Sequence, residues 1–236
     1  MEAAMVERSY KQFCPVAMAA EILCTRWTVL VLRELLAGST RFNDLRRGLP
    51  RMSPALLSQR LKELEEAAIV EKVPVVGEPG VQAYALTRAG AELQPLIEGF
   101  GKWGQRWISS RVSLQQLDAS LLMWDMRRNL NFDPFPTDRR VIQFQYPDAP
   151  RNERSWWLIL APQCPVDLCS IDPGYDVDLY VSSSLEAMTA IWMGHDNVRD
   201  ARNHDRLLLT GDDQLASSME HWLKCSPFAK EEPQVA

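Results

Sequence analysis

The stretch from residue 38 to residue 66 constrains the fold most, because it ends one helix and begins another within a few residues. Gly38 is a typical helix C-cap, and Gly48-Leu49-Pro50 cannot continue a helix because proline lacks an N–H donor and restricts the residue before it. Ser53-Pro54 then supplies a capping side chain and a proline at the first helical position. These signals predict a short helix over residues 42–47, a tight turn and a second helix.

The helix that begins at Ser53 has one apolar side. Leu57, Leu61 and Leu64 follow each other at i, i+4 and i+7, the spacing of a single helical stripe. The residues off this stripe are polar or basic: Ser58, Gln59 and Lys62, with Arg60 beside the stripe. The pattern predicts a helix that is held by its leucines and presents its polar side to a partner.

The flanking segments complete a recognisable unit. An apolar helix is predicted over residues 18–37, and two strands are predicted over 69–76 and 81–86, joined by the turn Gly77-Glu78-Pro79-Gly80. Helix, short helix, turn, capped helix and hairpin in this order predict a winged helix-turn-helix.

Charge points to a polyanionic partner for this unit. The chain has 26 Lys and Arg against 31 Asp and Glu, for a net charge of −5, yet residues 41–62 carry six basic side chains and one acid. An acidic protein with one basic stretch has one surface suited to phosphates, although a solvated charged face is the alternative. The residues predicted to read DNA bases are Ser53, Ser58, Gln59 and Arg60. The residues predicted to bind DNA phosphates are Arg41, Arg46, Arg47, Arg51 and Lys62.

Residues 10–108 carry a dense family resemblance. Its markers are Cys14-Pro15-Val16, the run ILCTRWTVLVLRELLAGSTRFNDLRRGLPRMSPALLSQRLKELEEAAIV and the segment YALTRAG. These residues closely resemble HxlR-type winged helix-turn-helix transcription regulators. The resemblance implies a bacterial, cytoplasmic homodimer on a palindromic operator, with residues 53–66 as the recognition helix and dimerisation through helices at both ends of the winged domain. The wing tip departs from the pattern, because Glu78 would repel a phosphate.

A long apolar stripe follows the hairpin. It predicts a helix that packs on a second copy of the chain, with intramolecular core as the alternative. The residues predicted to form this dimer interface are Leu93, Ile97, Phe100, Trp103 and Trp107.

The five cysteines are odd in number and scattered, which suits a reducing compartment better than a disulfide framework. Several relatives of the resembled family use the cysteine of the equivalent Cys-Pro pair as a thiol switch, so the resemblance makes Cys14 a candidate redox switch. The alternative is a small side chain packed at the dimer interface. Cys24, on the predicted apolar helix, is expected to serve packing alone.

The sequence predicts three segments: the winged domain over residues 1–110, a second domain over 111–228 and a flexible tail over 229–236. In the second domain a helix and a loop at 131–136 precede several strands, a helix, a strand and a closing helix, an order typical of an α+β fold with an antiparallel-rich sheet. The run VDLYVSSSLEAMTAIWMGHDNVRDARNHDRLLLTGDDQLASSMEHWL, at residues 177–223, resembles the C-terminal half of the sterol-carrier-protein type of lipid-binding fold.

Large or adaptable apolar side chains are frequent in this second domain. They are candidates to line a pocket for an apolar small-molecule effector, and filling the core is the alternative. The candidate pocket residues are Met123, Trp124, Trp156, Met188, Trp192, Met219 and Trp222.

Other classes of function find little support in the sequence. There is no nucleophile elbow, no phosphate-cradling loop and no set of ligands at structural-zinc spacing, so no enzyme, metal or cofactor is expected. No run of about 18 apolar residues and no secretory signal occur, so we expect a cytoplasmic protein.

The sequence thus predicts a homodimeric DNA-binding regulator, a repressor modulated by an apolar molecule. The alternatives are a redox sensor acting through Cys14 and a lipid-binding protein whose winged domain mediates protein contacts.

Overall fold

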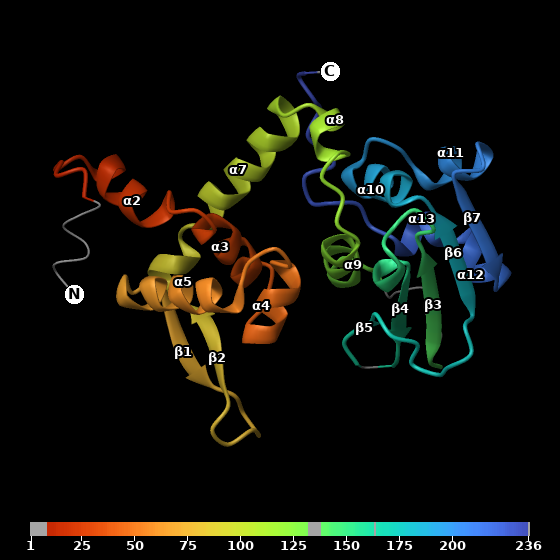
Figure 1. Ribbon diagram of the computed structural model, residues 1–236, viewed down its shortest axis with the longest axis horizontal. Coiled ribbons are helices and arrows are strands. Elements are labelled where there is room, and N and C mark those ends of the chain that lie inside the picture. Colours follow the sequence, from red (N-terminus) through yellow and green to blue (C-terminus); the bar gives the residue numbers. More distant parts are fainter. Residues whose placement is uncertain (1–8, 132–137, 163, 236) are drawn as a thin grey trace. The chain divides into compact units, whose positions relative to one another are not determined.

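The computed structural model describes residues 9–131, 138–162 and 164–235 (Figure 1). The predictions for residues 1–8, for most of the loop at 131–136 and for Ala236 lie outside this part of the chain. The chain divides into two compact units between Phe100 and Gly101, earlier than the predicted boundary at residue 110.

The first unit contains short helices and one two-stranded hairpin. In chain order its elements are α2 (Pro15–Leu23), α3 (Thr28–Leu36), α4 (Phe42–Gly48), α5 (Pro54–Glu66), β1 (Val70–Pro74), β2 (Gln82–Leu86), α6 (Arg88–Ala91) and α7 (Gln94–Trp107), which continues past Phe100. The strands pair antiparallel from Val70 opposite Leu86 to Pro74 opposite Gln82. Figure 1 shows this hairpin extending beyond α5 and ending in a loop, which is the wing of a winged helix.

Leucines of α5 form the centre of the core of this unit. Leu57, Leu61 and Leu64 are almost completely buried, as their spacing predicts. They pack in one cluster with Val31, Leu32, Leu35, Leu45, Leu49, Met52, Ile69, Val70 and Ile97. Burying one such side chain contributes about 1.5–3 kcal/mol, so this cluster fixes the orientation of α5.

The apolar segment over residues 18–37 differs from its prediction. It forms two helices, α2 and α3, bent by 82° relative to each other, instead of one. Trp27, directly before α3, has a left-handed backbone with φ of 79°, and this conformation turns the chain. No residue of α2 is buried, and Cys24 is exposed, so its predicted packing role is wrong.

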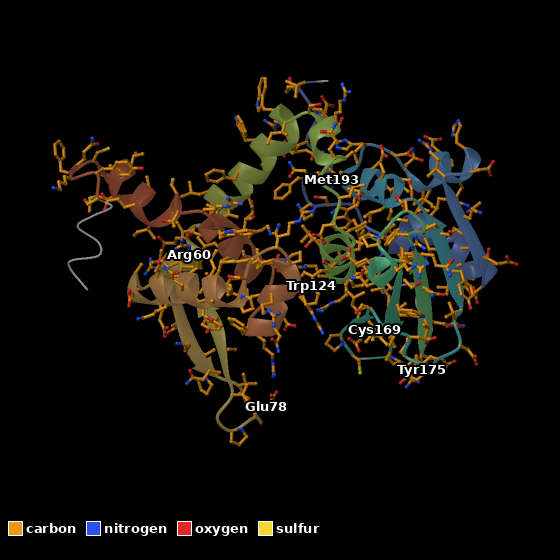
Figure 2. All side chains as sticks on the ribbon, viewed as in Figure 1. Arg60, Glu78, Trp124, Cys169, Tyr175 and Met193 are labelled. Atoms are coloured by element: carbon orange, nitrogen blue, oxygen red, sulfur yellow. The ribbon has the colours of Figure 1, made fainter. Side chains whose placement is uncertain are left out.

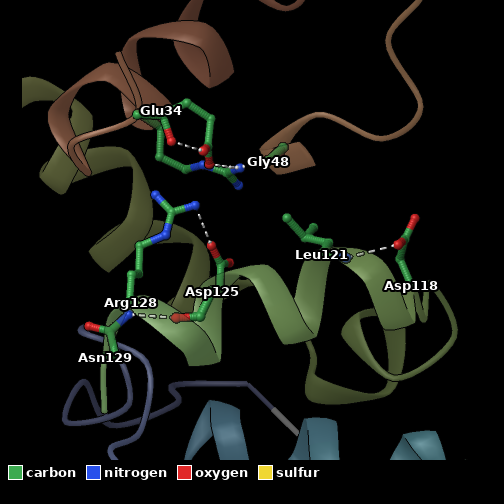
Figure 3. Close-up of polar contacts among 9 residues, drawn as sticks. Glu34, Gly48, Asp118, Leu121, Asp125, Arg128 and Asn129 are labelled. Carbon is green, nitrogen blue, oxygen red and sulfur yellow. Dashed lines mark hydrogen bonds and ion pairs between the residues drawn. The ribbon is translucent and has the colours of Figure 1, made fainter. Parts of the chain in front are cut away.

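A carboxylate is buried where α3 meets α4. The side chain of Glu34 is fully buried, accepts a hydrogen bond from Ser39 Oγ at 3.0 Å and pairs with Arg33 Nη2 at 2.7 Å. The same Arg33 nitrogen donates to the carbonyl oxygen of Gly48 at 2.8 Å, beside Glu34 in Figure 3. A Cβ added to Gly48 would lie 1.9 Å from Oε2 of Glu34, so glycine is required at this contact.

The second unit is an α+β fold with one mixed sheet. After α7 its elements are α8 (Ser110–Ser113), α9 (Ala119–Arg128), β3 (Arg140–Gln145), the 3-10 turn η1 (Arg151–Glu153), β4 (Ser155–Leu160), β5 (Asp167–Cys169), β6 (Leu179–Ser183), α10 (Leu185–Met193), α11 (Val198–Asn203), β7 (Leu207–Gly211), α12 (Asp213–Ser217) and α13 (Met219–Trp222). The strand order is β5-β4-β3-β6-β7, in which β3 and β6 pair in parallel and the other neighbours pair antiparallel.

Capping side chains mark where the helices of this unit begin. In α9, Asp118 Oδ1 accepts the N–H of Leu121 at 3.1 Å, and Arg128 pairs with Asp125 at 3.2 Å in the last turn (Figure 3). Ser184, Asn197 and Asp212 cap α10, α11 and α12 in the same way. Polar caps of this kind contribute about 1 kcal/mol each.

The C-terminal segment packs along the second half of α7. A Cβ added to Gly101 would lie only 2.2 Å from Cζ of Phe228, so the ring of Phe228 packs directly against this glycine. Arg106 Nε donates to Glu231 at 2.7 Å, and the carbonyl of Arg106 accepts the N–H of Gln234 at 2.7 Å. These contacts involve part of the predicted tail, whose flexibility stays a prediction.

Replacing Gly48 with alanine should lower the free energy of unfolding by about 1–3 kcal/mol, because the new methyl group displaces a buried carboxylate from its hydrogen bonds. Urea denaturation followed by circular dichroism measures the change. Gly99→Ala is the matched control, since nothing lies within 4 Å of a Cβ built there and alanine favours a helix interior. Equal stability of the two variants would contradict the steric role of Gly48.

Candidate nucleic-acid interface

Helix α5 presents a polar strip opposite its buried leucines. Ser58, Gln59 and Lys62 are exposed, as the stripe predicts. Gln59 Nε2 donates to Glu63 Oε1 at 3.0 Å, so its amide must leave this bond to contact another group. Exposed hydroxyl, amide and ammonium groups along one helix side can donate to or accept from base edges in a major groove.

Ser53 has the capping role that the sequence predicts, whereas Arg60 has structural contacts that the sequence did not predict. Ser53 Oγ caps α5 by accepting the N–H of Leu56 at 3.3 Å. Arg60 is only 8% exposed, and its Nε donates to the carbonyl oxygen of Arg26 at 3.1 Å, at the corner between α2 and α3.

The guanidinium of Arg60 also pairs with Glu63, and Figure 2 shows Arg60 on the side of α5 toward this corner. A side chain held in this way cannot reach a base from this conformation. The structure therefore gives Arg60 a packing role in place of the predicted base contact.

The predicted phosphate-binding residues lie at the surface around α4 and α5. All five are exposed: Arg41, Arg46, Arg47, Arg51 and Lys62. Two of them have loose acidic neighbours on their own helix, Arg47 with Asp44 at 3.8 Å and Lys62 with Glu66 at 3.8 Å. Exposed pairs of this kind are weak, so they leave the positive charge of the surface largely intact.

The wing brings an acid to this basic surface. Glu78, at the tip of the hairpin in Figure 2, forms a double hydrogen bond and ion pair with Arg41, which lies 37 positions earlier in the chain. The hydrogen bond from Arg41 lowers the pKa of the Glu78 carboxyl below its ordinary value. From the sequence we expect Glu78 to repel phosphate, but its partner Arg41 is not predictable, because no local signal brings the two positions together.

The predicted dimer stripe divides in the structure. Ile97 is buried in the core of the first unit and is not available to a second copy, whereas Leu93 is partly buried and packs against that core. Phe100, Trp103 and Trp107 are each more than half exposed, and Leu96, which the prediction did not include, is exposed beside them. The second half of α7 thus carries an apolar surface.

A second apolar surface lies at the N-terminal end of the described chain. Phe13, Val16 and Met18 are exposed, on α2 and directly before it. The residues alone did not predict this surface; the signal was the resemblance, which implied dimerisation helices at both ends of the winged domain.

Cys14 occupies the N-cap position of α2 and is half-buried. Its side chain makes no capping hydrogen bond, but the nearby backbone N–H groups of Ala17 and Val16 lower the pKa of the thiol below its ordinary value. A helix N-terminus is a known means of stabilising a thiolate.

The candidate pocket residues of the second unit are packed in its core. All seven are buried in one cluster: Met123, Trp124, Trp156, Met188, Trp192, Met219 and Trp222. Contacts within the core include the indole N–H of Trp222 to the carbonyl of Leu215 at 2.9 Å. A groove of about 380 Å³ lies elsewhere, lined by Ile191, Asn197, Val198, Arg199, Asp200, Glu220, Leu223 and Cys225. The structure thus favours the core-filling interpretation of these side chains.

Among the described residues, no group of three or more His, Cys, Asp or Glu is arranged to hold a metal ion. Among the same residues no single helix is long and apolar enough to cross a membrane; α2 and α3 reach that length and composition only as a bent pair.

Comparison with known proteins matches the first unit to a family. Residues 22–112 match the model of the HxlR-like helix-turn-helix family. An uncharacterised helix-turn-helix transcriptional regulator of Bacillus subtilis, YvaP, is 38% identical over 98 residues, which are 41% of this chain and 91% of the relative. The chain belongs to the HxlR family. Members of this family are transcription regulators that bind DNA through the helix-turn-helix.

Two further relatives of the HxlR chain cover the same region. A regulator from Synechocystis, sll1512, is 35% identical over 46% of this chain and 78% of its own length. The solved structure of the reduced regulator YodB from Bacillus subtilis is 34% identical, covers 40% of this chain and 93% of that chain, and gives a TM-score of 0.34. The family match ends at residue 112, so the sterol-carrier-like identity of the second unit stays a prediction.

The role of Arg60 in this HxlR chain can be tested by stability. Arg60→Ala should lower the free energy of unfolding by about 1.5–3 kcal/mol, because it removes a buried charge-assisted hydrogen bond to Arg26. Gln59→Ala, one position away on the exposed side, should change it by less than about 0.5 kcal/mol. Chemical denaturation of both variants provides the measurement, and an Arg60→Ala protein as stable as Gln59→Ala would restore Arg60 as a base-reading candidate.

Proposed function

We propose that this protein is a homodimeric transcription regulator that binds a palindromic operator with α5 in the major groove. The observation that carries the proposal is the two-sided character of α5, with Leu57, Leu61 and Leu64 in the core and Ser58, Gln59 and Lys62 exposed. Exposed Arg46 lies in the last turn of α4, and exposed Arg51 lies in the turn between α4 and α5, where DNA phosphates flank an inserted helix.

The exposed apolar surface of α7 supports self-association. Leu96, Phe100, Trp103 and Trp107 recur at helical spacing and are all exposed, and a two-fold dimer can bury the same patch from both copies. The dimer then places two α5 helices about 34 Å apart, one turn of DNA. Repression is the simplest consequence, because occupancy of a promoter is sufficient for it. Modulation by an apolar molecule remains a prediction from the sequence.

Binding to duplex DNA at rising salt concentration tests the proposal. Fluorescence anisotropy with a labelled operator should show an affinity that falls steeply with salt, because basic side chains release counterions from the phosphates. No binding at low salt would contradict the regulator and favour the alternative, a lipid-binding protein whose winged unit contacts other proteins.

Two single substitutions separate base reading from phosphate binding. Gln59→Ala should reduce the preference for operator over random DNA by about 1–3 kcal/mol, because it removes a group placed to contact a base edge. Arg46→Ala should weaken binding to both DNAs alike and reduce the salt slope by about one. Anisotropy titrations with both duplexes provide the measurement, and equal losses from the two variants on both DNAs would contradict the assignment of α5.

The position of Cys14 favours thiol-based control as a second candidate function. Its side chain is at a helix N-terminus, where backbone N–H groups stabilise the thiolate. A peroxide can transfer one oxygen atom to this thiolate, which gives a sulfenic acid and leaves water or an alcohol. The larger, polar side chain would alter the start of α2, whose exposed apolar side adjoins Phe13. We propose that this change alters the dimer geometry and, through it, DNA affinity, within the 1–3 kcal/mol typical of coupling between sites.

The reactivity of Cys14 toward iodoacetamide should extend to lower pH in the native protein than in the urea-unfolded chain. The folded protein lowers the thiol pKa, so the reactive thiolate is populated at a pH where the unfolded chain still holds the thiol. Mass spectrometry of the labelled peptide gives the rate at each pH. Identical pH profiles in the two states would remove the basis for a switch at Cys14.

A further inference from the structure

The ion pair between the wing and α4 suggests a built-in competitor for DNA. We propose that Glu78 occupies, in the DNA-free protein, the position at Arg41 that a backbone phosphate of the operator takes, so that binding exchanges a carboxylate for a phosphate. This inference rests on the proposed DNA-binding function and adds a determinant of its affinity.

The geometry of the pair is the geometry of phosphate recognition. Arg41 Nη1 donates to one oxygen of Glu78 at 3.0 Å, while Nη2 donates to the other oxygen. A guanidinium binds carboxylates and phosphates through the same two parallel N–H groups, so Arg41 can bind either anion in this bidentate geometry. Both side chains are near half-exposed, at 44% and 45%, so the pair lies where a DNA phosphate can reach it.

The backbone of the wing holds Glu78 over this arginine. Gly77 and Gly80 have φ of 84° and 82°, values that glycine adopts without strain, and they turn the loop on either side of Glu78. The N–H of Glu78 bonds to the carbonyl of Val75 at 3.2 Å, and the carbonyl of Glu78 accepts the N–H of Val81 at 3.1 Å. The main-chain bonds of the turn therefore fix the place of the carboxylate.

The other end of the hairpin is anchored beside Arg41. The N–H of Tyr84 on β2 donates to the carbonyl of Thr40 at 2.8 Å, directly before Arg41. A backbone hydrogen bond thus joins strand β2 to the residue before Arg41. The fold therefore brings the side chains of Glu78 and Arg41 close together.

Such a contact has a measurable consequence for DNA binding. Arg41 must lose its carboxylate partner before it can bind a phosphate, so the pair offsets part of the affinity that Arg41 supplies. Removing the carboxylate leaves the guanidinium ready for the phosphate and should strengthen binding. Exposed ion pairs contribute little, which limits the gain to about two- to fivefold.

The test compares the parent protein with Glu78→Gln by anisotropy titration against one operator duplex at several salt concentrations, in phosphate-free buffer. Glu78→Gln should bind about two- to fivefold more tightly at low salt, with a salt slope steeper by up to about one. Glu71→Gln is the matched control, because it removes the same charge from an exposed position on β1 of the same hairpin.

A double-substitution cycle with Arg41→Gln separates exchange from simple repulsion. In an Arg41→Gln background, the gain from Glu78→Gln should fall to that of the Glu71→Gln control, because no guanidinium is left to release. A gain of full size without Arg41, or a Glu78→Gln protein no different from Glu71→Gln, overturns the inference while leaving the proposed function intact. Absence of binding by every variant, the parent included, overturns both.

Discussion

The burial of three leucines on one side of α5 is the packing interaction on which the candidate interface depends. Leu57, Leu61 and Leu64 lie within the core of the first unit, so α5 cannot rotate without exposing them. At about 100° per residue, a rotation by one position would carry the polar strip into the core and leave its groups without hydrogen-bond partners. Core packing therefore determines which residues of α5 are exposed to a partner.

The sequence predicted the winged unit closely because its signals are local. Helical spacing, the Ser53 cap and the glycine turn each act within a few residues, and the structure has the helices and strands where these signals place them. The errors arise where distant segments meet. Arg60 lies about 60° from the leucine stripe, at its edge, and its burial depends on the carbonyl of Arg26. In one continuous helix over residues 18–37, as predicted, the carbonyl of Arg26 would bond within the helix. The break between α2 and α3 leaves it available to Arg60.

The same limit explains the rest of the predicted sites. Residue types showed that the large side chains of the second unit are buried, but a methionine or tryptophan that fills a core has the same sequence signature as one that lines a cavity. The stripe along α7 is periodic throughout, yet Ile97 is buried and Phe100 is exposed, because the core of the first unit ends between them. Periodicity predicts which side of a helix is apolar. It does not predict how far along the helix that side is covered by the core.

The contacts of the C-terminal segment with α7 have a consequence for synthesis of the chain. Phe228, Glu231 and Gln234 leave the ribosome more than a hundred residues after the glycine and arginine of α7 that they contact. During translation the winged unit already has all of its own core residues, but the second half of α7 lacks this cover. The half of α7 that bears Trp103 and Trp107 therefore gains these contacts only after residues 228–234 have been synthesised.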